Sequence, residues 1–122
     1  MKTVLQEIFD VLDDRKDEMI ALRRNFHQHP ELSFHETETA RKIAAFYDGK
    51  DCTVMTHVGG GNGILVDIQG GKPGKHIAIR ADFDALPIQE ETDVPFASTV
   101  PGVMHACGHD GHTAYMMILA DT

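Results

Sequence analysis

The chain has 122 residues and a formal net charge of −8, and 42% of its residues are hydrophobic. This composition is typical of a globular domain with an apolar core, and it excludes a disordered or fibrous chain. The acidic balance also argues against nucleic acid or an anionic membrane as the main partner, because both attract a basic surface.

Neither a membrane span nor a secretory signal is expected. The apolar runs are far shorter than the roughly 20 residues of a transmembrane helix. Acidic residues follow Val4 and Leu5 closely, which is incompatible with the apolar core of a signal peptide. With two cysteines the chain is no disulfide scaffold, so we expect a cytoplasmic protein.

The first part of the chain predicts helices. Apolar residues recur at helical spacing over 4–12 and again over 19–26, with a polar stretch between them. We expect either one long helix with a solvated middle or two helices that break near Asp14. Pro30 should close this segment, because the residue before a proline is pushed out of the helical region.

A further helix is predicted at about 36–48. Ser33 followed by Glu36 has the form of a capping box, in which the two side chains cap the first turn of a helix. Gly49 stands where the residue after a helix C-terminus is expected.

Strands are predicted beyond residue 50, because the apolar period changes from 3.6 to 2. They fall at 52–58, 64–68 and 76–81, and the last two could pair as a hairpin across the loop between them. Residues 82–107 are irregular, and helical composition returns from Gly108. This mixture of helices and strands indicates an α/β layer.

The strongest chemical signal is residues 104–113, Met-His-Ala-Cys-Gly-His-Asp-Gly-His-Thr. Residues i and i+2 of an extended chain point to one side, so Cys107 and His109 can converge on one ion. A thiolate with an imidazole suits zinc, while nickel, cobalt and manganese remain open. Taken singly, Cys107 is better explained as a small buried apolar residue, and only the cluster favours a metal. His105 and His112 could either support the ligands or face a substrate.

A second segment, residues 80–87, carries Asp82 and Asp84 directly after the predicted strand 76–81. Ligands of α/β sheets gather beyond the carboxyl ends of strands, so both aspartates could face one site. A carboxylate there could fix the tautomer of a ligand histidine. An equal alternative is a strand-ending turn with two solvated aspartates.

A third segment, residues 23–32, contains His27 and His29 near the end of a predicted helix. Free carbonyl groups at a helix C-terminus need donors, and the helix dipole favours imidazolium there. We therefore expect a structural role for both histidines rather than ligation.

Together these segments resemble the M20 metallopeptidase family. The patterns are Arg-Arg-x-x-His-x-His-Pro-Glu-Leu-Ser, Ile-Arg-Ala-Asp-x-Asp-Ala-Leu-Pro-Ile and Met-His-Ala-Cys-Gly-His-Asp-Gly-His-Thr. Their order and spacing match the family from about Met19 to Thr113. They are most similar to its amidohydrolase branch, which includes N-acyl-amino-acid amidohydrolases, hippurate hydrolases and indole-acetyl-amino-acid hydrolases.

The resemblance implies an α/β fold, in which residues 1–122 are the N-terminal portion of a three-layer metallopeptidase catalytic domain with helices packed on a mixed sheet. It implies metal-dependent hydrolysis of amide bonds in N-acyl amino acids or small peptides, with two divalent ions (zinc, manganese, nickel or cobalt) and a homodimer in the full-length protein. Cys107 and His109 would be metal ligands, and Asp84 would be the catalytic aspartate that orients the metal site. Asp82 stands where other branches place a ligand histidine.

The resemblance also predicts what residues 1–122 lack. The family's lid and dimerisation domain, its general-base Glu pair and its remaining ligands lie downstream of the Cys-Gly-His motif. Glu90 and Glu91 precede that motif, so we do not assign them as the base. We therefore expect an N-terminal fragment that is inactive alone. The alternative is a non-catalytic short chain that acts as an interaction module or binds metal weakly.

Overall fold

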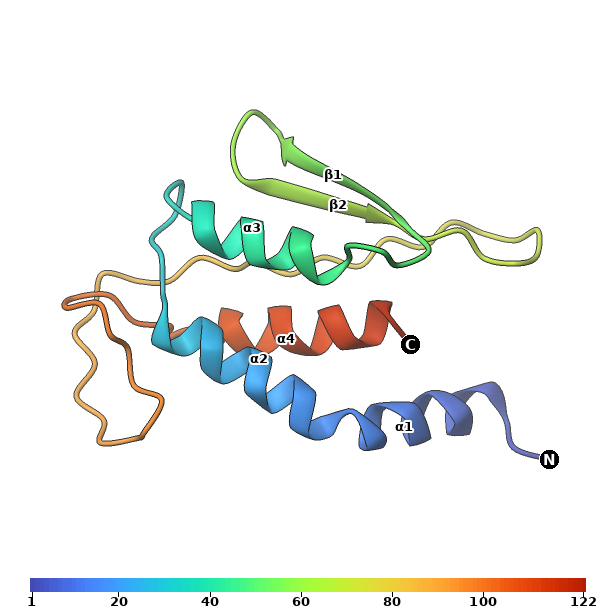
Figure 1. Cartoon of the computed structure of the whole chain (residues 1–122), viewed down its shortest axis with the longest axis horizontal. Helices are drawn as coiled ribbons and strands as arrows, with labels where there is room; N and C mark the ends of the chain where they lie inside the picture. The colour runs from blue at the N-terminus through green and yellow to red at the C-terminus, as the bar shows by residue number, and fades with distance from the viewer.

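The computed structural model describes all residues 1–122 and confirms the α/β class (Figure 1). Its elements in chain order are α1 (Val4–Asp14), α2 (Lys16–Gln28), α3 (Thr37–Phe46), β1 (Thr53–Val58), β2 (Gly63–Asp67) and α4 (His109–Ala120). No helix is long and apolar enough to cross a membrane.

The first two helices are separate, as one of the two sequence alternatives predicted. They meet at Arg15, whose backbone departs from helical geometry with φ −100° and ψ 10°. A capping box does start α1, where Thr3 and Gln6 bond each other's backbone N–H groups. Two short helices joined at one polar residue therefore replace a single long helix.

The capping box predicted for α3 is wrong. Glu36 precedes this helix but makes no side-chain cap bond, and the Ser33 hydroxyl donates to Asp84 instead. The carboxylate of Glu31 caps the helix, because it accepts the backbone N–H of Thr39 at 2.6 Å and its hydroxyl at 2.7 Å. The chain turns between Glu31 and the start of α3, so the carboxylate of Glu31 lies against the first turn of the helix.

The sheet is an antiparallel hairpin of β1 and β2, with Thr53 opposite Asp67 and Met55 opposite Leu65. The prediction that 64–68 pairs with 76–81 is therefore wrong, and residues 76–81 form no strand. Their backbone makes no hydrogen bond to another segment. β2 pairs instead with β1, its neighbour in sequence, and no segment supplies the inter-strand hydrogen bonds that would make 76–81 a strand. Figure 1 shows the chain leaving β2, turning in a loop and running back across the molecule.

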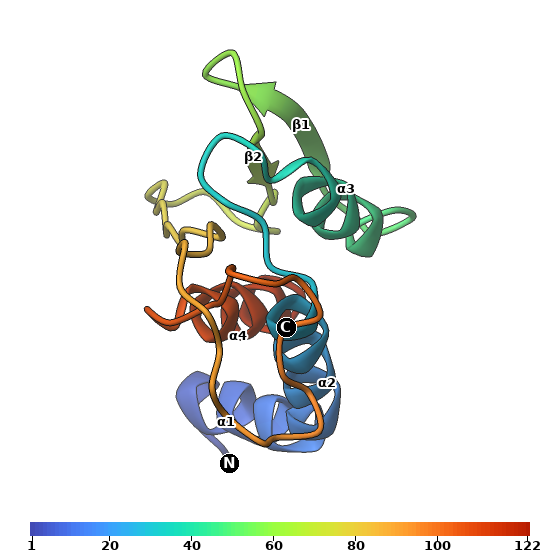
Figure 2. The ribbon, with the colours of Figure 1, turned by 90° about the vertical axis from the view of Figure 1, so that its left-hand side faces the viewer.

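The core lies between the helices and the inner face of the hairpin. Phe26 of α2, Ile43 of α3 and Met117 of α4 meet Tyr47, and apolar residues of β1 and β2 pack against them. Figure 2 shows the hairpin with α3 on one level and α1, α2 and α4 on the other. Because Phe26 of α2 and Met117 of α4 share this core, the two helices lie side by side. This packing positions the N-terminus of α4.

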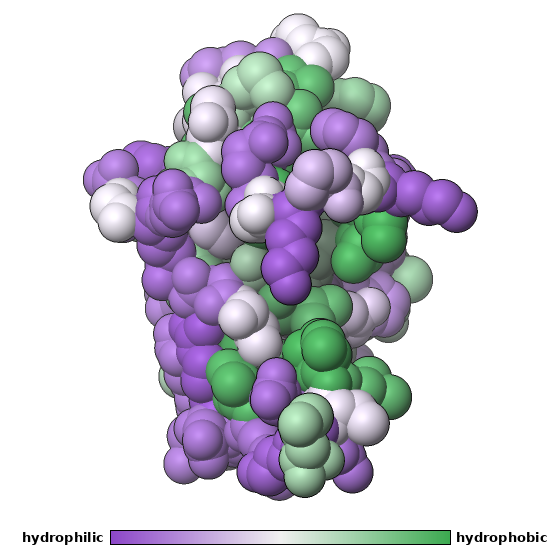
Figure 3. Space-filling view, turned by 90° about the vertical axis from the view of Figure 1, so that its right-hand side faces the viewer, coloured by the Kyte–Doolittle hydropathy of each residue, from purple (hydrophilic) through white to green (hydrophobic).

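Helix α1 adds nothing to that core, because none of its residues is buried. Val4 and Phe9 are 73% and 55% exposed. Figure 3 views the side on which both termini lie and shows apolar surface among polar residues there. The molecule thus carries apolar surface that its own elements do not cover.

Candidate metal centre

The three segments singled out in the sequence meet in space. The backbone N–H of Ala85 bonds the carbonyl of Glu31 at 2.8 Å, and Leu86 exchanges backbone bonds with Met104 at 2.9 and 3.0 Å. These contacts form one parallel and one antiparallel bridge beside the N-terminus of α4. The chain thereby gathers the Pro-Glu-Leu-Ser, Asp-x-Asp and Cys-Gly-His segments at one place.

At this junction Asp84 holds His109. Oδ1 of Asp84 lies 2.8 Å from Nδ1 of His109, and the backbone carbonyl of Asp84 lies 3.0 Å from the same nitrogen. Since both partners are acceptors, Nδ1 carries the proton and donates it. Nε2 of a neutral His109 is then left with its lone pair, which is the form that binds a metal.

Asp84 itself is stabilised as a carboxylate. The hydroxyl of Ser33 donates to its Oδ2, and the side chains of Asp84 and His109 are 24% and 20% exposed. The bond from Ser33 holds the pKa of Asp84 below its ordinary value, burial opposes this, and the bond from His109 adds to it. Asp84 thus stays charged against His109 at neutral pH.

The residues present fit a divalent metal in their chemistry. Cys107 is exposed and free, and it precedes His109 by two residues. Thiolate sulfur and imidazole nitrogen are the donors that zinc and similar ions prefer. No group of three or more histidine, cysteine, aspartate or glutamate side chains in the chain could hold an ion together. The chain therefore offers two donors, one fewer than a catalytic zinc normally takes from its protein.

The other predicted site residues lie apart from this pair. The carboxylate of Asp82 pairs with the exposed Arg80, while its backbone carbonyl accepts the hydroxyl of Thr113 at 2.8 Å. His112 is exposed, with its ring centroid 6.2 Å from that of His109. The structure therefore brings Asp84, rather than Asp82, to His109.

His105 is the one buried histidine of the motif. It is 4% exposed, and neither ring nitrogen has a hydrogen-bond partner. Burial lowers the pKa of its imidazole, with smaller opposing contributions from Asp110. His105 is thus a neutral side chain enclosed by the protein.

The two histidines of the first segment have structural partners. His29 donates from Nδ1 to the carbonyl of Asn25 at 2.8 Å, and its backbone N–H donates to the same carbonyl at the end of α2. His27 is 3% exposed and lies between two carboxylates, those of Asp110 and Glu90. Sequence reasoning did not identify Ser33 or Glu90 as partners, since only the folded chain brings them to these sites.

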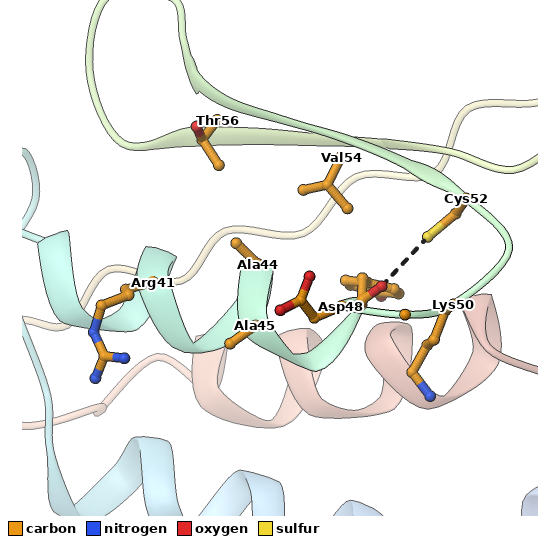
Figure 4. Close-up of a pocket in the computed structure, with 10 residues that line it drawn as sticks. Arg41, Ala44, Ala45, Asp48, Lys50, Cys52, Val54 and Thr56 are labelled. Atoms are coloured by element: carbon orange, nitrogen blue, oxygen red, sulfur yellow. Dashed lines mark hydrogen bonds between the residues drawn. The ribbon is translucent and has the colours of Figure 1, made fainter.

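Among the hollows of the molecule, one adjoins the candidate centre and another lies away from it. The hollow between α3 and β1, of about 480 Å³, is lined by residues such as Arg41, Asp48 and Cys52, and none of the predicted ligands lines it (Figure 4). The other, of about 710 Å³, has both Gly108 and His112 in its wall. The second hollow thus opens next to the metal motif.

A carboxylate that orients a histidine is a common arrangement behind metal-ligating histidines, and Cys107 stands two residues before His109 in the chain. Comparison with known proteins confirms the resemblance to the M20 family. Residues 78–122 match the model of Peptidase family M20/M25/M40. The chain is therefore similar to M20 peptidases in the segment that carries Asp84, Cys107 and His109.

Relatives extend this match over nearly the whole chain. YhaA of Bacillus subtilis (strain 168) is 54% identical over 120 residues, 98% of this chain and 30% of the relative. The N-acyl-L-amino acid amidohydrolase of Geobacillus stearothermophilus is 46% identical over 112 residues, 92% of this chain and 30% of the relative. The chain thus spans about 30% of the length of these relatives.

A solved structure shows the same fold. The Bacillus subtilis YXEP protein, a dinuclear metal binding peptidase from the M20 family, matches with a TM-score of 0.79 and 46% identity. The match covers 86% of this chain and 30% of YXEP. The α/β fold of this chain is accordingly similar, over 86% of its length, to part of an M20 peptidase.

Proposed function

We propose that residues 1–122 form the N-terminal portion of the catalytic domain of a metal-dependent amidohydrolase, which cleaves amide bonds in N-acyl amino acids or small peptides. The main support is the 2.8 Å contact between Oδ1 of Asp84 and Nδ1 of His109, with the free Cys107 two residues before His109 in the chain. The names of the relatives support the substrate class, since one is an N-acyl-L-amino acid amidohydrolase.

In this proposal each residue has one task. Asp84 keeps His109 in the tautomer whose Nε2 is a ligand, and Cys107 supplies a thiolate from the turn before α4. A bound divalent metal, such as zinc, manganese, nickel or cobalt, would lower the pKa of a water molecule and polarise the scissile carbonyl. The YXEP structure supports two ions in the complete site, since that relative is a dinuclear metal binding peptidase.

We further propose that the 122-residue chain does not catalyse this reaction alone. Its two donors fall short of the three protein ligands of a usual catalytic zinc, and no glutamate lies against Cys107 or His109 to move a proton. The test is to add zinc, manganese or nickel to the purified chain and to offer hippurate. We expect no turnover, and measurable turnover would refute this part of the proposal.

Metal binding is tested separately with cobalt. A thiolate-to-cobalt charge-transfer band should appear and should vanish in Cys107→Ser. Cys52→Ser is the matched control, because Cys52 is half-buried near the hairpin and its thiol donates weakly to the carbonyl of Tyr47. Equal loss in both variants, or no band at all, would count against Cys107 as a ligand.

The amidohydrolase function is tested with a chimaera. The chain replaces the corresponding N-terminal part of the Geobacillus enzyme, to which it is 46% identical over 112 residues. The chimaera should hydrolyse N-acyl amino acids, and His109→Ala in it should abolish that activity. A folded chimaera without activity would refute the proposed function.

A second candidate function is an interaction module without catalysis. It is favoured by the apolar side chains that α1 exposes, such as Val4 and Phe9. Sedimentation of the purified chain tests this second function. An interaction module should form a defined oligomer. A chain that stays monomeric at all concentrations would oppose this function.

A further inference from the structure

A buried chain of charges adjoins the candidate centre. His27 of α2 is 3% exposed, and its Nδ1 lies 2.7 Å from Oδ2 of Asp110 while its Nε2 lies 2.9 Å from Oε1 of Glu90. Asp110 is 1% and Glu90 9% exposed. Because a carboxylate oxygen faces each ring nitrogen, two ionised carboxylates require both nitrogens to donate.

Further protein groups bond both carboxylates of this cluster. Asp110 also accepts Nε of Arg23 at 2.9 Å on Oδ2 and the backbone N–H of Gly111 at 2.9 Å on Oδ1. Glu90 also accepts the hydroxyl of Thr92 and the backbone N–H of Ser98. Arg23 and the ring of His27 thus hold Asp110 and Glu90 from within the protein. Asp110 is therefore held by protein groups and not free to bind a metal.

Burying three ionisable groups beside the partly exposed Arg23 gains little stability over apolar packing, so fold stability alone does not explain the cluster. Its position suggests another role. Asp110 directly follows His109 in the first turn of α4, and Gly108 before it has φ +87° and provides no capping side chain. The first turn of α4 is thus held by the cluster through Asp110, and not by a cap.

His109 is held from two sides as a result. On one side Asp84 accepts the proton of Nδ1, and on the other Asp110 fixes the backbone that carries the imidazole. We propose that the His27-centred cluster is a positioning device, which sets the direction of His109 by anchoring the first turn of α4 to α2 and to the loop that carries Glu90. The inference rests on the proposed function only for the role of His109 as a ligand.

The test compares two ion clusters at opposite ends of α4. His27→Gln removes the imidazole that bridges Glu90 and Asp110 in the cluster at the N-terminal end. Asp121→Asn is the matched control, because Asp121 accepts Lys50 and Arg15, each at 2.8 Å, just beyond the C-terminal end. Both variants weaken an ion cluster on the same helix, but only the first lies next to His109.

Two readouts in the metal-free chain report on the position of His109. The ring nitrogen shifts of His109 in NMR show which nitrogen carries the proton, and hydrogen exchange reports the His112 amide, which bonds the carbonyl of Gly108 at 3.0 Å. In His27→Gln we expect mixed tautomers and about tenfold faster exchange of that amide. In Asp121→Asn both should match the wild type. Unchanged ring shifts and exchange in a folded His27→Gln chain would overturn the inference.

Cobalt affinity separates this inference from the proposed function. We expect His27→Gln to weaken it about tenfold, the lower end of the range for groups that support metal ligands. If the wild-type chain binds no cobalt through Cys107, the proposed function fails while the ring shifts still decide the positioning role. If His27→Gln does not fold, Arg23→Gln, which removes one contact to Asp110 from a partly exposed side chain, decides it by the same readouts.

Discussion

The contact between Asp84 and His109 makes the sharpest prediction, through the substitution Asp84→Asn. The amide can keep a hydrogen bond to Nδ1 of His109, and the Ser33 hydroxyl can turn to accept from its NH₂ group. Two bonds to a charged acceptor thus become neutral, and each loses about 1 kcal/mol. Both side chains are about one-fifth to one-quarter exposed, so solvent screens part of this loss. We expect a net destabilisation of about 1–2 kcal/mol.

Denaturant unfolding of the chain measures the stability, and cobalt titration measures the site. The expected loss in cobalt affinity is about tenfold or more, since the carboxylate makes His109 a better ligand. Asp82→Asn is the control, because its carboxylate pairs with the exposed Arg80 and should change stability by less than about 0.5 kcal/mol. If Asp82→Asn and Asp84→Asn give equal effects, Asp84 does not orient His109.

Three further predictions concern the rest of the chain. The pKa of Asp121 lies below its ordinary value of 3.8, since the bonds from Lys50 and Arg15 outweigh burial, so Asp121→Asn should destabilise by about 0.5–1 kcal/mol at neutral pH. That difference should vanish as the pH falls through the folded pKa of Asp121, and a difference that grows in acid would contradict the sign. Gly108→Ala should destabilise by about 1 kcal/mol in thermal unfolding, because φ is +87°, and an unchanged melting temperature would be evidence against that strain. A thiol reagent should modify exposed Cys107 faster than Cys52 and zinc should slow only Cys107; protection of both would argue against a local site.

The sequence predicted the elements whose signal is local. The apolar period of α2 and the glycine before α4 are visible in a few residues, and both helices lie where expected. The pairing of Cys107 with His109 was likewise a local inference from spacing. Whether they bind a metal stays a prediction.

Contacts between distant residues could not be predicted in the same way. Ser33 matched a capping box, yet its hydroxyl bonds Asp84, 51 residues further along the chain. Residues 76–81 have the alternation of a strand, but strand formation depends on a neighbour that the local pattern does not specify. His27 was expected to serve the free carbonyls at the end of its helix, whereas its ring contacts the carboxylates of Glu90 and Asp110, 63 and 83 residues away, which only the fold brings to it.

The unpaired stretch 76–81 also offers a second copy of the chain an edge on which to pair in concentrated solution. Ile77 and Ile79 are 84% and 64% exposed on a backbone with free N–H and C=O groups, and such an edge can template another strand. Lys72 and Lys75 lie just before it and repel a second copy. Salt shortens the reach of that repulsion from about 10 Å at 0.1 M to about 3 Å at 1 M. High ionic strength should therefore promote precipitation of this chain, and a low-salt buffer should keep it dispersed.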